Sequence, residues 1–142
     1  MPQPGSRFQN PVSSIQHPAS AYIPFRYISD ARQRIEIYRK LAQVMDKAGL
    51  SSLEQELRDR FGPIPPQLAL LLQVAELKVL ASERGIPVIE VKEDKLMLTR
   101  NNDYIMMGHK FPRLTKKQPA ARLKEIKKSL TLVVDPQQAR VI

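Results

Sequence analysis

Three charged residues stand close together just before a glycine–proline break. Glu56, Asp59 and Arg60 precede Gly62 and Pro63, in a stretch whose leucines are spaced for a short helix. Side chains of these types can form ion pairs. They also fit the solvent-facing end of a helix in which Arg60 pairs locally, an exposed contact worth only about 0–1 kcal/mol. The residues by themselves give no reason to expect more than this.

A second charged group fills residues 109–128, which hold eight Lys or Arg and one Glu. Cationic side chains gathered on one face can contact the phosphates of a nucleic acid. They can also form an ordinary solvated face of a helix that buries one narrow apolar stripe. Aromatic residues near the segment are limited to Tyr104 and Phe111, so recognition of particular bases is not indicated. The possible phosphate-contacting residues are Lys116, Lys117, Lys124, Lys127 and Lys128.

No other arrangement of residues suggests catalysis or a bound cofactor. The chain has no Cys, which excludes disulfides, thiolate metal sites and a cysteine nucleophile. Its two histidines, His17 and His109, are too few for a His-rich metal site. The five glycines are isolated, and no glycine-rich phosphate-binding loop occurs. We therefore expect no catalytic, cofactor-binding or metal-binding residues in this chain.

Length and charge place the chain in a broad class. Its 142 residues, 42% of them apolar, suit one folded domain. Residues 29–94 hold ten basic and eleven acidic residues, whereas residues 95–142 hold eleven basic and three acidic ones, so the net charge of +9 belongs to the C-terminal third. No apolar run approaches the ~18 residues of a membrane span. Residues 1–20 lack the pattern of a signal peptide, and a cytoplasmic protein is the default expectation.

The two ends of the chain and the entry to the first helix have distinct compositions. Residues 1–20 contain four prolines without a repeat, which predicts a flexible linker or arm. Residues 21–28 are apolar and broken by Pro24, which predicts an extended segment. The last residues, 135–142, predict a loose tail. We expect a single domain over residues 21–134.

Hydrophobic spacing predicts three helices in the N-terminal half. The first begins at a cap formed by Ser29 or Asp30, buries a stripe of apolar residues and stops near Gly49. The second spans about residues 52–61, with Ser51 and Glu54 as a capping box and Gly62 as its end. The third runs from about Pro66 to Arg84 and is apolar enough to be covered on more than one side. The expected stripe of the first helix is Ile35, Tyr38, Ala42 and Met45, widened by Ile37, Leu41 and Val44.

The C-terminal half predicts a small sheet followed by a basic helix. Residues 87–92 and 95–100 alternate as two strands of a hairpin, and residues 104–107 as a third strand. Thr115 and Gln118 fit a capping box for a last helix, whose apolar stripe is Leu123, Ile126 and Leu130. The predicted fold class is α+β, with three N-terminal helices packed on a small antiparallel sheet and a C-terminal basic helix.

Several stretches together resemble one protein family, the C-terminal domain of the bacterial transcription-repair coupling factor. The resemblance covers about residues 20–134. It is most specific in the D-R-F-G-P-x-P element and in the entry to the first helix, where Ser29 stands at a position at which proline is common in the family. The stretches are residues 22–24 (YIP), 27–30 (YISD), 32–41 (RQRIEIYRKL), 57–65 (LRDRFGPIP), 71–78 (LLQVAELK) and 85–86 (GI).

The resemblance implies a non-catalytic regulatory domain of a much larger ATP-driven DNA translocase. In that family other domains bind ATP and Mg²⁺, pull on duplex DNA and bind RNA polymerase. The domain itself packs on an N-terminal module related to the excision-repair helicase subunit, and it masks the surface that recruits the damage-recognition subunit. Acidic residues before D-R-F-G contribute to that contact, which by position implies a protein interface at Glu56 and Asp59, with Arg60 beside them. The alternative from another class is a basic nucleic-acid-binding module that uses residues 109–128.

Overall fold

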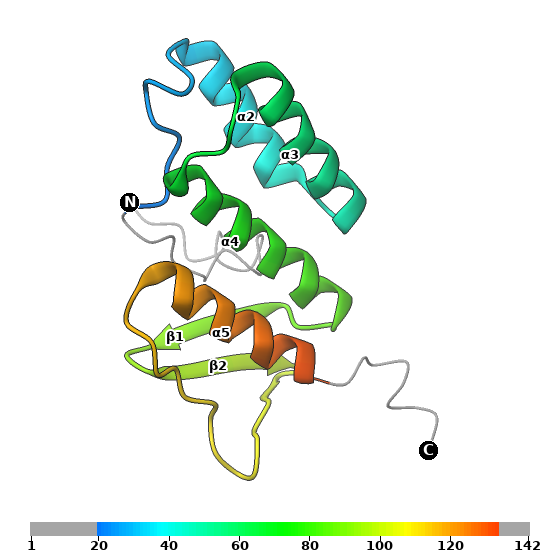
Figure 1. Cartoon of the computed structure of the whole chain (residues 1–142). Helices are drawn as coiled ribbons and strands as arrows, with labels where there is room; N and C mark the ends of the chain where they lie inside the picture. The colour runs from blue at the N-terminus through cyan, green and yellow to red at the C-terminus, as the bar shows by residue number, and fades with distance from the viewer. Residues whose placement is uncertain (1–19, 134–142) are drawn as a thin grey trace, which may run out of the picture. The chain divides into compact units, whose positions relative to one another are not determined.

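The computed structural model of the chain describes residues 20–133 (Figure 1). The predicted tail, residues 135–142, and all but the last residue of the predicted arm, residues 1–20, lie outside the described residues. His17 lies outside them as well.

The described residues divide into two compact units, which we treat separately. One unit ends at Val79 and the other begins at Leu80. We call them the N-terminal unit and the C-terminal unit. The boundary falls within one helix, and the single domain expected over residues 21–134 stays a prediction.

The predicted α+β class is confirmed, because the described residues form four helices and one three-stranded antiparallel sheet. None of these helices is long and apolar enough to cross a membrane. The elements in chain order are α2 (Ala31–Gln43), α3 (Lys47–Phe61), α4 (Pro66–Glu83), β1 (Val88–Lys92), β2 (Lys95–Arg100), β3 (Asp103–Tyr104) and α5 (Pro119–Leu132).

Helix α2 begins at its expected cap but buries only one side of its predicted stripe. The Asp30 carboxylate accepts hydrogen bonds from two backbone N–H groups of the first turn, at 2.8 and 3.1 Å. Ile37 is fully buried, whereas Ile35 is 56% and Met45 84% exposed. The predicted stripe was therefore right only in part. Its widening residues, Ile37, Leu41 and Val44, pack in the core, whereas its first-named residues are exposed, because the stripe is broader than the face that the core covers. The exposed set is Ile35, Tyr38, Ala42 and Met45.

Helix α3 begins earlier than predicted. Asp46 is its cap and accepts a hydrogen bond of 2.7 Å from the N–H of Gly49, so Gly49 lies in the first turn of α3 and does not end α2. The proposed capping box of Ser51 and Glu54 was therefore wrong, since both residues lie inside the helix. The end of α3 was predicted correctly. Gly62 has φ of 97°, a region that favours glycine, and its N–H donates to the carbonyl of Arg58.

Buried apolar side chains from all three helices form the core of the N-terminal unit. Figure 1 shows α2 and α3 side by side, joined by a short break in which Val44 caps α2. Helix α4 starts at Pro66, as expected, and is buried around much of its circumference. The buried members of this core are Ile23, Ile28, Ile37, Leu53, Leu57, Leu68, Leu71 and Leu72.

In the C-terminal unit the sheet is built from two tight turns. Strands β1 and β2 pair through the turn at Glu93 and Asp94, as predicted, and Leu96 and Leu98 are buried on one face. Asn101 and Asn102 both have positive φ, which suits asparagine in a two-residue hairpin turn to β3. Strand β3 has two residues, Asp103 and Tyr104, and is shorter than expected. Beyond it Ile105 still donates to the carbonyl of Leu98, at 2.8 Å, while Met107 turns away to pair with Lys110.

Helix α5 lies beside the β1–β2 hairpin and buries the predicted stripe of Leu123, Ile126 and Leu130 (Figure 1). Its predicted capping box was wrong. The cap residue, Gln118, makes no side-chain hydrogen bond, and Pro119 fills the first turn, where a missing N–H is tolerated. The hydroxyl of Thr115 donates instead to Glu125, further along the helix.

Candidate functional site

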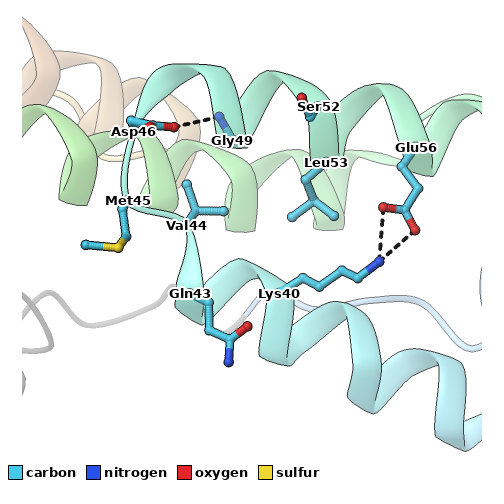
Figure 2. Close-up of a pocket in the computed structure, with 9 residues that line it drawn as sticks. All are labelled: Lys40, Gln43, Val44, Met45, Asp46, Gly49, Ser52, Leu53 and Glu56. Carbon is cyan, nitrogen blue, oxygen red and sulfur yellow. Dashed lines mark hydrogen bonds and ion pairs between the residues drawn. The ribbon is translucent and has the colours of Figure 1, made fainter.

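Glu56 lies at the centre of an ion-pair network between α2 and α3. Its carboxylate accepts hydrogen bonds from the Lys40 ammonium group at 2.9 and 3.1 Å (Figure 2). It also accepts one from the Arg60 guanidinium at 2.6 Å. Glu36 lies 3.6 Å from each of the same two cations. The local pairing of Arg60 with its own helix is thereby confirmed. Glu56 thus holds the two helices together and does not stand free.

The network sets the protonation of its members. Hydrogen bonds from Lys40, and then from Arg60, hold the pKa of Glu56 below its ordinary value. The Glu56 carboxylate in turn raises the pKa of both cations. The Glu56 side chain is 31% exposed, so water screens each pair and its contribution to stability is modest.

Asp59 differs from Glu56, although it is only three residues away. It is exposed and accepts one hydrogen bond, of 3.0 Å, from the side-chain amide of Gln55 on its own helix. No cation of the described residues forms an ion pair with it. Of the three residues singled out from the sequence, Asp59 is therefore the one whose charge is left available on the surface.

Tyr27 fixes the end of α3 on which these residues lie, a role that no pattern in the sequence indicated. Its hydroxyl donates to the carbonyls of Leu57, at 3.1 Å, and Gly62, at 2.7 Å. Its ring packs against Phe61 with 5.8 Å between centroids, and the guanidinium of Arg60 lies 4.8 Å from the Phe61 ring centre. Burial raises the pKa of the Tyr27 hydroxyl. The side chain thus joins the extended entry segment to the D-R-F-G element.

An open groove of about 430 Å³ lies beside Glu56, between the end of α2 and the start of α3. Figure 2 shows Leu53 and Val44 facing one another across it, with the Lys40–Glu56 pair at one end and the Asp46–Gly49 cap at the other. The acidic end of α3 is therefore continuous with a partly apolar hollow. The lining residues are Lys40, Gln43, Val44, Met45, Asp46, Gly49, Ser52, Leu53 and Glu56.

The lysines proposed for phosphate contact all lie in the C-terminal unit and are exposed. Lys116 and Lys117 precede α5, and Lys117 lies 3.6 Å from Asp94 in the hairpin turn. The other three, Lys124, Lys127 and Lys128, lie on α5 itself. Among residues 20–133 no cluster of three or more His, Asp or Glu side chains could hold a metal ion.

Comparison with known proteins identifies the family. The family model described as the TRCF domain matches residues 17–108, from the entry segment to just beyond β3. A transcription-repair-coupling factor of Bacillus subtilis is 37% identical over 79 residues, which are 56% of this chain and 7% of that protein. One from Borreliella burgdorferi is 30% identical over 100 residues, 70% of this chain and 9% of that protein.

A solved structure, titled as the C-terminal domain of transcription-repair coupling factor, has the same fold. Its TM-score is 0.65 at 22% identity, over 91% of this chain and 93% of that one. The matched part of this chain spans less than a tenth of the curated relatives. Because the family model covers well over half of the sequence, the chain belongs to the TRCF domain family, the C-terminal domain of transcription-repair coupling factors.

Proposed function

We propose that this domain is a non-catalytic, autoinhibitory part of a transcription-coupled DNA repair translocase. It lies on an N-terminal module related to the excision-repair helicase subunit, and so masks the surface that recruits the damage-recognition subunit. The observation that supports this most directly is the exposed carboxylate of Asp59, immediately before the family's D-R-F-G element. A carboxylate with which no cation of residues 20–133 pairs suits a contact with a basic docking surface.

Glu56 enters this proposal in a different role from Asp59. Its carboxylate is already bound by Lys40 and Arg60, so a cation of the partner would have to share it or displace one of them. Truncating Glu56 would also leave Lys40 and Arg60 with Glu36 alone, at 3.6 Å from each. We therefore assign the direct contact to Asp59, and to Glu56 the placement of Arg60 at the same surface.

The remaining functions belong to other parts of the longer protein. The relatives are named transcription-repair-coupling factors, which supports this view. We propose that ATP and Mg²⁺ bind in motor domains outside this chain, and that double-stranded DNA and RNA polymerase are also bound there. Such a protein acts in the bacterial cytoplasm, where these partners are found.

The masking contact must be weak enough to open during repair. A conformational equilibrium shifts only by the difference in affinity of a ligand for its two states, so a mask of a few kcal/mol is what recruitment could still overcome. The deciding measurement is calorimetric binding of this chain to the isolated N-terminal module. We expect Asp59→Ala to weaken binding about ten-fold or more, since a charged contact at an interface loses its partner.

A matched control removes a carboxylate elsewhere. Glu90 is exposed on β1, in the other unit, and Glu90→Ala removes the same charge. It should leave binding unchanged. Unchanged binding by both Asp59→Ala and Glu56→Ala would remove the residue assignment, and absence of binding by the unmodified chain would remove the masking proposal. In the full-length protein, deletion of the domain should strengthen binding of the damage-recognition subunit.

A further inference from the structure

We propose that the exposed side of α2 is a docking surface for an acidic amphipathic helix of a protein partner. The surface lies in the N-terminal unit, and we call it the α2 outer face. It uses none of the residues assigned to masking, so the proposal does not depend on the proposed autoinhibition. Its members are Arg32, Ile35, Tyr38, Arg39, Ala42 and Met45, all of which are exposed.

An apolar stripe runs along the middle of the α2 outer face. Ile35 and Ala42 lie about two helical turns apart on the same side of α2, with Tyr38 beside them. Met45 lies just beyond the end of the helix and lines the open groove of about 430 Å³. Ala42 is the smallest residue of the stripe and leaves room for a larger side chain of a partner. An exposed apolar side chain therefore recurs at nearly every turn of α2.

Tyr38 is held in place although it is exposed. Its hydroxyl accepts a hydrogen bond of 2.9 Å from the backbone N–H of Ile23, a residue buried in the core. A side chain that is fixed beforehand loses little conformational freedom on binding, which favours affinity. Tyrosine, methionine and arginine are also enriched at protein interfaces, and all three types occur on the α2 outer face.

The charges on the α2 outer face are positive and have no anion of their own. Within the described part of the chain, neither the Arg32 nor the Arg39 side chain forms an ion pair or a hydrogen bond. Glu36, the one acidic residue of α2, pairs instead with Lys40 and Arg60, at 3.6 Å from each. The two free arginines suit a partner that brings carboxylates to this side of α2.

The spacing of the face favours a helix as the partner. Arg32 and Arg39 are seven residues apart, as are Ile35 and Ala42, so each pair lies about 10 Å apart along one side of α2. A repeat of seven residues is the one by which two helices pack along their length. The partner helix would therefore place apolar side chains opposite Ile35 and Ala42, and carboxylates opposite the two arginines.

Other occupants match the α2 outer face less well. Helices that lie on a membrane are rich in Lys and Arg on their polar side, whereas α2 exposes two arginines. A nucleic acid would contact those two arginines and leave the apolar stripe uncovered. A second copy of the chain, packed through the same face, would set two positive surfaces against one another.

The experiment uses this chain and two synthetic helical peptides of three heptads, each with leucines along one side of the helix. The residues that flank the leucines are glutamate in one peptide and lysine in the other. Calorimetry measures the affinities, and NMR follows the backbone N–H signals of the chain. We expect the glutamate peptide to bind at least ten-fold more tightly than the lysine peptide. It should shift the signals of residues 32–45.

Reversal of the two arginines tests the charge complementarity directly. The variant Arg32→Glu, Arg39→Glu should bind the glutamate peptide at least ten-fold more weakly and should prefer the lysine peptide. Because this variant gains affinity for one peptide, a folding defect cannot produce the result. The matched control, Lys92→Glu with Lys110→Glu, makes the same change of charge at exposed positions of the C-terminal unit. It should keep the preference of the unmodified chain.

Equal affinity for the two peptides, or absence of binding by the glutamate peptide, would overturn the proposal. An equal loss of affinity in the control and in the Arg32→Glu, Arg39→Glu variant would overturn it as well, since only net charge would then matter. Shifted signals confined to residues outside α2 would contradict the location of the surface. If the arginine variant abolished binding to anionic-lipid vesicles, or sedimentation as a dimer, the face would belong to a membrane or to a second copy instead.

Discussion

The charged side chains of the two units have different kinds of partner. In the N-terminal unit the cations Lys40 and Arg60 are paired with Glu36 and Glu56, so charges tie helix to helix. In the C-terminal unit Glu125 is bound by backbone N–H groups and a hydroxyl instead, while the lysines of α5 face outward. Charged side chains therefore join helices to one another in one unit, whereas in the other many of them are exposed on the surface.

The comparison also separates surfaces of opposite sign. The N-terminal unit offers an exposed carboxylate, Asp59, beside a neutralised network. The C-terminal unit has exposed lysines on α5, while its Glu125 carboxylate accepts hydrogen bonds from the loop before that helix. The two units thus differ in the sign of the charge that they expose, a carboxylate in one and lysines in the other.

If packing rather than ion pairs holds the N-terminal unit together, a core truncation should have the largest effect. Ile37→Ala removes a fully buried side chain and should lower the free energy of unfolding by about 2–5 kcal/mol. Ile35→Ala, two residues away on the exposed side of α2, should change it by less than about 0.5 kcal/mol. Urea unfolding measures both. Similar losses would contradict the observed orientation of α2.

A smaller effect is expected from the hydroxyl that fixes the end of α3. Tyr27→Phe leaves the carbonyls of Leu57 and Gly62 without their donor and should cost about 1–3 kcal/mol in unfolding free energy. Burial raises the pKa of Tyr27, so the protonated hydroxyl stabilises the fold. This stabilisation is fully present at pH values below the unfolded pKa and is lost as the pH rises through the folded pKa. The stability gap between wild type and Tyr27→Phe should thus shrink at strongly alkaline pH. A constant gap would exclude this role.

The smallest expected effect distinguishes the two kinds of glutamate contact. The pKa of both Glu56 and Glu125 is lower in the folded protein than in the unfolded chain, where it is about 4.3. Each carboxylate therefore stabilises the fold at pH values above its unfolded pKa. This contribution is lost as the pH falls through the folded pKa. Cations lower the pKa of Glu56, whereas mainly neutral hydrogen-bond donors lower the pKa of Glu125. Raising salt to about 1 M should therefore move the pKa of Glu56 toward its ordinary value and that of Glu125 less. Titration of the carboxyl carbons by NMR measures this, and equal movement would contradict the contrast.

Residues at helix ends and in turns were predicted well from the sequence. Asp30 begins α2, Gly62 and the proline after it end α3, and Glu93 with Asp94 turns the hairpin, because each residue satisfies or forbids backbone conformations locally. The resemblance to the TRCF family was confirmed for the same reason, since it depends on local elements such as D-R-F-G-P-I-P. The failures came where two local signals competed. Gly49 suggested a helix end, but Asp46 caps the helix in which it lies.

The sequence by itself determined the α+β class, the helix and strand types and the concentration of positive charge in the last third. Tertiary structure decided which side of α2 is buried, that Glu56 is held by Lys40 across two helices, and that Glu125 binds the loop before α5. Spacing along one element fixes only which residues share a face. Which face meets a neighbour, and which charges are neutralised there, depends on residues far away in the chain. Asp59 remains available because no cation of the described residues pairs with it.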